Sequence, residues 1–231
     1  MRETTLTGTL FCLAMASMTW GAEPDDLHVA AKRALVLGVK FYHEQAASHG
    51  GYVYRYSSDL QKQEGEGVTT PQTVWVQPPG TPSVGEAYLR AWQRTKDPAC
   101  LAAAQAAAEC LRHGQYRSGG WNASIEFEPA ERAKHAYRVD PPAPKKRQRN
   151  TSSLDDDKTQ SALRFLMRLD HALGQKDQRL HETTEFALNP LSASGCRETV
   201  FDLSGLAIAI ISLLVWLTSF QIHTYHLLCV G

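Results

Sequence analysis

The sequence predicts an all-α fold, namely an α/α toroid formed by an incomplete barrel of helix pairs, with long loops and short irregular strands. Segments of helical length carry apolar residues at helical spacing. They alternate with loops rich in glycine and proline, which free or fix the backbone and end helices. A helix, a Gly-Gly-aromatic loop and a second helix also recur, and repeated helix pairs bury their apolar faces against one another.

Helices are predicted wherever the apolar residues keep helical spacing over ten or more positions. The predicted ranges are 28–45, 83–94, 97–113, 159–173 and 177–188. Asp97 and Asp177 lie at the N-cap positions of two of them. Gly114 and Gly174 lie where helices are expected to end.

An internal repeat links these helices. Two of them lead into Gly-Gly-aromatic sequences that end at Tyr52 and at Trp121, and a short segment after each could pair as an irregular strand. The helices that come next begin with the related sequences Thr81-Pro-Ser-Val and Thr159-Gln-Ser-Ala. Stacked helix pairs of this kind would gather their loops at one end and form a cleft there.

Composition limits the kinds of ligand. The 231 residues suffice for one well-cored domain, and 24 Lys and Arg balance 24 Asp and Glu. A chain without net charge has no overall field to attract nucleic acid, so we expect no nucleic-acid partner. An acidic ligand must instead be bound by a local cluster of side chains. We expect a monomer.

The first 22 residues are interpreted as a signal peptide. Arg2 is followed by a mostly apolar run from Leu10 to Trp20, and Gly21 and Ala22 are small residues suited to cleavage. The other interpretation is a frayed apolar terminus. With a signal peptide, we expect a secreted or periplasmic protein whose folded part, the N-terminal part of the toroid, covers residues 23–190.

Residues 191–231 do not continue the repeat, because no Gly-Gly-aromatic sequence follows the helix predicted at 177–188. The run 203–220 carries no formal charge and is long enough to cross a bilayer. One interpretation is a transmembrane segment that anchors the protein, in which case the membrane is a partner. The other is a frameshift product unrelated to the fold.

The cysteines do not indicate a disulfide framework. Cys100 and Cys110 lie in one predicted helix, where ten residues span about 15 Å. A disulfide requires Cα atoms within about 7 Å of each other. We therefore interpret both as buried free thiols.

Asp155, Asp156 and Asp157 precede a predicted helix, and two interpretations remain open. One aspartate could cap the helix while the others are solvated. Alternatively, the three carboxylates could bind Ca²⁺, which prefers hard oxygen ligands.

Aromatic and basic residues gather in the predicted loops. The candidates for substrate binding are Tyr54, Arg55, Trp75, Trp121 and Arg138. Aromatic faces stack on sugar rings, and arginine binds carboxylates through paired hydrogen bonds. Together with calcium, such residues would suit an acidic polysaccharide. The alternative interpretation is that the aromatic residues pack helix ends and that the basic run 145–149 is solvated.

Several of these segments resemble one family, the pectic acid lyases of polysaccharide lyase family 10. The matching segments are 49–57, 64–67, 73–85, 118–122 and 154–159, within a resemblance that covers about residues 25–190. The resemblance implies an α/α toroid that cleaves polygalacturonate by calcium-dependent β-elimination. It also implies that Asp157, with Asp156 or Asp155 beside it, belongs to the calcium site.

The resemblance ends near residue 189. The arginine that serves as the base in the family comes from a later part of the fold, and Arg197 does not lie in a matching context. The catalytic residue is therefore unknown, and we expect little or no lyase activity. Two alternatives are a non-catalytic protein that binds acidic polysaccharide and an inverting glycoside hydrolase that uses Glu126, Glu128 or Asp157.

Overall fold

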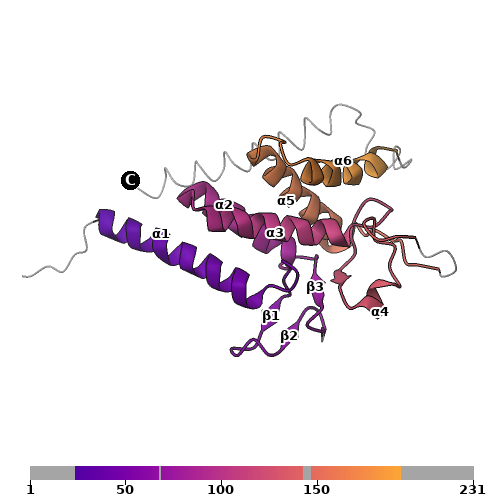
Figure 1. Ribbon diagram of the computed structural model, residues 1–231, viewed down its shortest axis with the longest axis horizontal. Coiled ribbons are helices and arrows are strands. Elements are labelled where there is room, and N and C mark those ends of the chain that lie inside the picture. Colours follow the sequence, from indigo (N-terminus) through magenta and orange to yellow (C-terminus); the bar gives the residue numbers. More distant parts are fainter. Residues whose placement is uncertain (1–23, 68, 143–146, 194–231) are drawn as a thin grey trace, which may run out of the picture.

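The computed structural model describes residues 24–67, 69–142 and 147–193, and its fold is mainly helical (Figure 1). The helices are α1 (Pro24–Phe41), α2 (Thr81–Thr95), α3 (Pro98–Gly114), α4 (Pro129–Arg132), α5 (Lys158–Ala172) and α6 (Gln178–Ala193). A π-helical turn, Tyr42–Ala46, extends α1, and a 3-10 turn, Asp155–Asp157, precedes α5. The predicted helices are confirmed, with ends shifted by a few residues, whereas α4 was not predicted.

The strands are short and form two small antiparallel sheets. In one sheet β1 (Arg55–Tyr56) pairs with β2 (Gln63–Glu64). In the other, β3 (Thr73–Trp75) pairs with β4 (Ser124–Glu126). The register of the second sheet places Trp75 opposite Ser124, so it joins the loop after the first Gly-Gly-aromatic sequence to the loop after the second.

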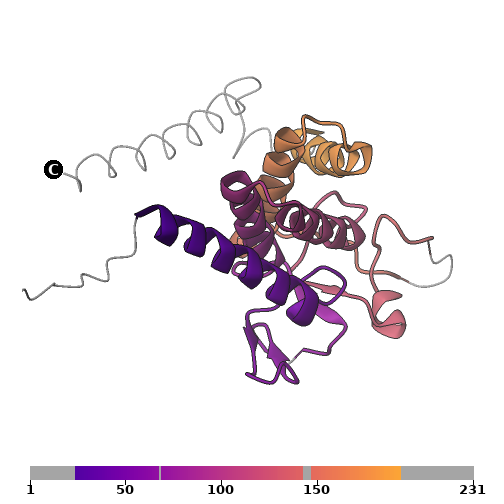
Figure 2. The ribbon, with the colours of Figure 1, turned by 60° about the vertical axis from the view of Figure 1, so that its left-hand side comes forward.

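The helices pack as consecutive pairs. α2 contacts α3, α5 contacts α6, and the two pairs meet where α2 contacts α5 and α3 contacts α6. Gly85 permits the α2–α5 contact, because a Cβ atom there would lie 2.4 Å from the ring of Phe165. Figures 1 and 2 show α6 and the β1–β2 hairpin at opposite ends of the molecule.

The core lies around α3. Ala103, Ala104 and Ala107 are fully buried, and their small side chains let α1 and α2 approach the α3 backbone closely. Large side chains fill the remaining space on either side. The largest of those that are fully buried are Trp121, Tyr52, Tyr116, Tyr137, Phe165 and Leu89.

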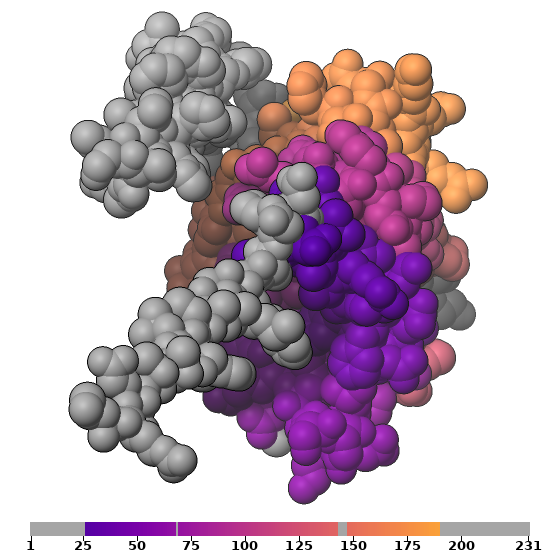
Figure 3. Space-filling model, turned by 90° about the vertical axis from the view of Figure 1, so that its left-hand side faces the viewer, coloured from indigo at the N-terminus to yellow at the C-terminus, as the bar shows by residue number. Residues whose placement is uncertain are grey.

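Helix α1 contributes only part of its surface to this core. Val39 is buried, but Leu27, Val29, Leu37 and Phe41 are each more than half exposed. Figure 3 shows α1, in indigo, along the outer surface of the molecule. Helix α1 therefore carries more apolar residues than it buries against α2 and α3.

The predicted repeat is visible in the hydrogen bonds. Thr81 Oγ1 accepts a hydrogen bond from the Tyr52 N–H (3.0 Å) and donates one to the Tyr52 carbonyl (3.3 Å). Thr159 Oγ1 makes the same pair of bonds with the N–H (3.0 Å) and carbonyl (3.1 Å) of Trp121. In both units a threonine near the start of a helix thus fixes the aromatic residue of the preceding loop, and both aromatic side chains are buried.

These threonines should contribute to stability to a similar extent. Replacing Thr81 or Thr159 by valine keeps the side-chain shape but leaves a buried backbone N–H without its partner, whereas the carbonyl keeps the hydrogen bond that it accepts from the N–H of Trp75 or Ser153. We expect each substitution to lower the free energy of unfolding by about 1–3 kcal/mol, measured by urea denaturation. The same change at the exposed Thr151 is the control and should cost less than about 0.5 kcal/mol. Equal effects at all three positions would contradict the structural role of the repeat.

Other local predictions can be compared with the structure directly. Asp97 Oδ1 accepts a hydrogen bond from the Ala99 N–H at 2.8 Å, and Asp177 Oδ1 accepts one from Arg179 at 3.1 Å, so both predicted N-caps are confirmed. Cys100 and Cys110 are buried free thiols, also as predicted.

Two predicted segments lie outside the described residues, namely the signal peptide at 1–22 and the apolar run 203–220. Within the described ranges, no helix is both long enough and apolar enough to cross a membrane.

Candidate functional site

Trp75 is the last residue of β3, and a tight turn leads from it to the start of α2. The chain turns through Pro78 and Pro79, which are joined by a cis peptide bond. The Gly80 N–H donates to the Gln77 carbonyl at 2.9 Å. A Cβ atom on Gly80 would lie 2.4 Å from the Trp75 carbonyl oxygen, so a side chain at this position would force the turn apart.

The indole ring of Trp75 is held on two sides. Gly65 packs against the ring so closely that a Cβ atom there would lie 2.4 Å from it. On another side, the ring of Tyr54 approaches at 5.7 Å between centroids, with an angle of 66° between the planes. Trp75 is partly exposed, so the ring is fixed in place while part of its surface remains accessible.

Several polar atoms beside Trp75 are buried without a hydrogen bond of normal length and angle. These are the Tyr54 hydroxyl, the Trp75 indole N–H and Gln77 Oε1. Gln77 is 9% exposed, and its Nε2 donates to Glu66 Oε1 at 2.7 Å. Leaving such groups unpaired costs free energy, so they are often found where a protein binds a ligand or water.

The acidic turn at 155–157 has an unusual backbone. Asp156 (φ 49°) and Asp157 (φ 59°) both adopt the left-handed conformation, which is uncommon for residues other than glycine. No aspartate side chain caps α5, so the capping interpretation is wrong. Arg164, two turns into α5, instead donates to both carboxylate oxygens of Asp157, with 2.9 Å from Nη1 to Oδ1.

Lys158 contacts the other two carboxylates. Its Nζ lies 3.2 Å from Asp156 Oδ2 and 3.7 Å from Asp155 Oδ2. Lys158 is 8% exposed, whereas the side chains of Asp155 and Asp156 are 80% and 54% exposed. The turn is therefore an accessible row of carboxylates above a buried ammonium group.

Tyr54, whose ring packs on Trp75, interacts electrostatically with the acidic turn. Burial raises the pKa of Tyr54, the indole N–H of Trp75 opposes this, and the negative charges of Glu66 and Asp156 raise it further. The hydroxyl of Tyr54 thus interacts electrostatically with two carboxylates, those of Glu66 and Asp156. We call the group formed by Tyr54, Glu66, Trp75, Gln77 and the turn at 155–157 the loop cluster.

Trp121 does not belong to the loop cluster, and the prediction that it stacks on a ligand is wrong. Its side chain is fully buried, and its Nε1 donates to the Leu111 carbonyl at 2.8 Å. Tyr52 occupies the corresponding place in the first repeat unit. It is also fully buried, and a threonine hydroxyl accepts a hydrogen bond from its backbone N–H, as for Trp121.

The two predicted arginines lie in different surroundings. Arg55 is exposed on β1 and forms an ion pair with Glu64 at 2.9 Å. The guanidinium of Arg138 lies over the ring of Phe186 on α6, 4.5 Å from its centroid, and burial lowers its pKa. The structure therefore packs Tyr54 on Trp75, and it places Arg138 against α6.

The donor chemistry of the acidic turn fits calcium, because three carboxylates on adjacent residues supply hard oxygen ligands. Their arrangement is not that of a preformed site. Within the described ranges, no group of three metal-ligating side chains surrounds a common position. Calcium would have to displace Lys158 and Arg164 from the carboxylates that they now contact.

This competition leads to a prediction about Lys158. Replacing Lys158 by methionine removes the buried charge that competes for Asp155 and Asp156 while filling a similar volume. We expect calcium to bind the variant about tenfold more tightly, measured by calorimetric titration. The same change at the exposed Lys176 should leave the affinity unchanged. Weaker binding by the Lys158→Met variant would show that the lysine does not compete with the cation.

Two residues of the loop cluster, and the lysine that contacts its aspartates, were not singled out in the sequence. Glu66 lies within a motif that carried the family resemblance, Gln77 follows the tryptophan, and Lys158 follows the aspartates directly. The position of Lys158 was a usable signal, since a cation next to three carboxylates is a natural partner for them.

Comparisons with protein families, curated proteins and solved structures gave no match for this chain.

Proposed function

We propose that this chain is a pectate-lyase-type protein whose loop cluster binds the uronate units of polygalacturonate, or of a related acidic polysaccharide, together with calcium. The observation that carries the proposal is that Tyr54, whose ring packs on the partly exposed Trp75, interacts electrostatically with Asp156 of the acidic turn. An aromatic face and a row of carboxylates are the two surfaces that a calcium-bound uronate chain requires.

Trp75 supplies the apolar part of this surface. Its ring is held by Gly65 and Tyr54, so little conformational entropy is lost when a sugar ring stacks on it. The Tyr54 hydroxyl and the Trp75 indole N–H are buried without a hydrogen bond of normal length and angle, and sugar hydroxyl groups would suit them as partners. A ligand that satisfied them would remove the cost of leaving them unpaired.

Asp155, Asp156 and Asp157 would hold the calcium ion. When bound, calcium would neutralise the carboxylate of a uronate unit and so strengthen its attachment to the acidic turn. The release of Asp157 would also free the guanidinium of Arg164, whose side chain is 47% exposed. Arginine binds carboxylates through paired hydrogen bonds, so Arg164 could then bind a second uronate carboxylate.

Elimination demands more than binding, because a base must remove the weakly acidic proton next to the uronate carboxylate. The cations that contact the acidic turn, Lys158 and Arg164, are both paired with aspartates. The segments that resemble the lyase family also do not include the arginine that serves there as the base. We therefore propose that binding is the main activity of the loop cluster and that β-elimination is weak.

The toroid is part of the same proposal. Two helix pairs, α2–α3 and α5–α6, follow one another in the chain and contact each other. Each begins with a threonine that fixes a Gly-Gly-aromatic loop. Repetition of this unit by rotation would give a ring of helix pairs whose loops meet at one end.

Electrophoresis of the full chain through gels that contain polygalacturonate tests the proposal. We expect calcium to increase the retardation of the protein and a chelator to reverse that increase. The absorbance of unsaturated product should rise little over the same period. A mobility that does not respond to calcium would contradict the proposed binding, and a rapid rise in absorbance would contradict the weak elimination.

A further inference from the structure

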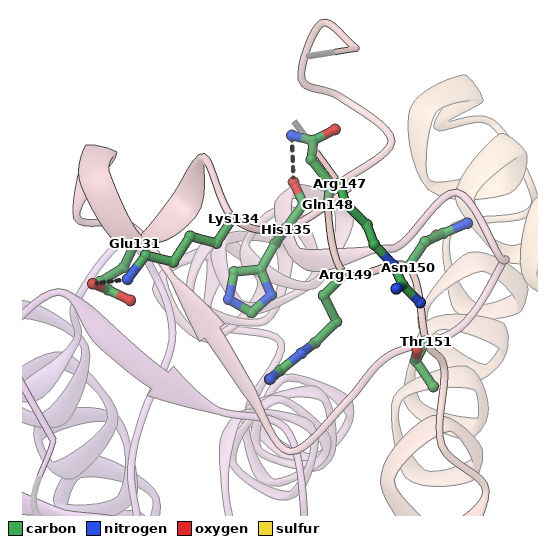
Figure 4. A pocket seen from close by; sticks show the side chains of 8 residues that line it. All are labelled: Glu131, Lys134, His135, Arg147, Gln148, Arg149, Asn150 and Thr151. Carbon is green, nitrogen blue, oxygen red and sulfur yellow. Dashed lines mark hydrogen bonds and ion pairs between the residues drawn. The ribbon is translucent and has the colours of Figure 1, made fainter. Parts of the chain in front are cut away.

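A second charged site lies outside the loop cluster. An open pocket of about 780 Å³ lies between the end of α4 and the segment 147–151 (Figure 4). Lys134 and His135 line it from one segment, and Arg147 and Arg149 line it from the other. Its walls thus come from two stretches of chain that run side by side in parallel at His135 and Arg149.

The cations of the pocket are not all neutralised by the protein. Lys134 forms an ion pair with Glu131 at 2.6 Å. Within the described ranges, neither Arg147 nor Arg149 has a carboxylate partner. Two guanidinium groups therefore remain available in a pocket that contains a single carboxylate, although the chain as a whole has no net charge.

The backbone of the pocket is fixed by hydrogen bonds between its two segments. The Arg149 N–H donates to the Lys134 carbonyl, and the Ala136 N–H donates to the Arg149 carbonyl, both at 2.8 Å. His135 is also held, because its Nδ1 lies 2.6 Å from the Tyr116 hydroxyl and its ring stacks on Tyr137 at 5.2 Å. Arg149 and His135 therefore keep their relative positions without a ligand.

We propose that this pocket is a second anion site, which binds the carboxylate groups of an acidic saccharide through Arg147 and Arg149 without calcium. A guanidinium group matches a carboxylate in geometry and charge. The anion site is independent of the loop cluster, whereas the choice of a saccharide as ligand rests on the proposed function. Nucleic acid is disfavoured because it requires an extended basic surface, and this pocket offers only a local one.

His135 provides a local reporter of binding. Burial lowers its pKa, and the positive charges of Arg149, Arg132 and Lys134 act in the same direction, whereas Glu131 opposes them. Tyr116 and Tyr137 are the remaining titratable groups in contact with its ring. An anion bound at Arg149 would offset the positive charge and raise the pKa of His135.

The test is a titration of the full chain with trigalacturonate in the presence of a chelator, followed by the NMR signals of His135 and by calorimetry. We expect trigalacturonate to bind and to raise the pKa of His135, and the neutral trisaccharide maltotriose to do neither. The double variant Arg147→Ala, Arg149→Ala should bind trigalacturonate about tenfold more weakly or worse. The matched control is Arg33→Ala, Arg94→Ala, which removes two exposed arginines elsewhere and should bind as the original chain does.

Equal affinities of the two double variants would overturn the site. If inorganic phosphate raised the pKa of His135 and trigalacturonate did not, the proposal that the ligand is a saccharide would be overturned. A thermal unfolding curve of each variant shows that the fold is retained. Because the chelator removes the calcium-dependent contribution, failure here is distinguishable from failure of the loop cluster to bind.

Discussion

Replacement of Trp121 by alanine is expected to lower the free energy of unfolding by about 3–5 kcal/mol, the largest effect of any single substitution considered. The side chain is fully buried, and its Nε1 bond to Leu111 is lost with it. The cavity would open beside the Thr159 hydroxyl that fixes the backbone of the same loop. Since a domain of this size is stable by only about 5–15 kcal/mol, urea denaturation should show a large shift of the midpoint.

Trp75→Ala is the matched variant, because it removes the same side chain from a partly exposed position. We expect a smaller loss of stability and a large loss of calcium-dependent polygalacturonate binding. The two tryptophans thus separate a structural role from a binding role. If Trp75→Ala destabilised the fold as much as Trp121→Ala and left binding intact, the assignment of the two roles would be wrong.

Simultaneous replacement of Asp155, Asp156 and Asp157 by asparagine should abolish the effect of calcium on polygalacturonate binding, with a loss of about a hundredfold or more in calcium affinity. Asparagine keeps the size of each side chain but removes the charge that holds the cation. Calorimetric titration with calcium measures the effect directly. The double variant Glu44→Gln, Glu128→Gln is the control, because both residues are exposed and lie outside the loop cluster.

The triple substitution leaves the buried Lys158 without its carboxylate partners, which could by itself destabilise α5. Addition of Lys158→Met removes that unpaired charge and keeps the comparison valid. If this fourfold variant bound calcium as tightly as the original chain does, the calcium site would lie elsewhere in the protein.

The helices could be predicted from the sequence because their cause is local. Apolar residues at helical spacing mark α2, α3 and α5, and Asp97 caps the start of α3 as its position indicated. The repeat could also be predicted, since its threonines and glycines recur at corresponding positions. Both kinds of signal depend only on neighbours along the chain.

The roles of the loop residues could not be predicted in the same way. Trp121 lies in a glycine-rich loop and Trp75 at the end of a strand before one, and only the tertiary packing buries the first and leaves the second partly exposed. The acidic run looked like a helix cap, yet the left-handed backbone of Asp157 directs its carboxylate to Arg164. Comparison of Trp121 with Tyr52 in the repeat was the one sequence signal that could have indicated its burial.

The central claim is that calcium and uronate meet at the loop cluster, and the NMR signal of the Trp75 indole N–H tests it most directly. The signal is assigned by comparison with Trp75→Phe. We predict that trigalacturonate shifts it when calcium is present, and that it stays in place with a chelator or in the triple asparagine variant. A Trp75 signal that remains unchanged while trigalacturonate and calcium bind to the protein would contradict the account.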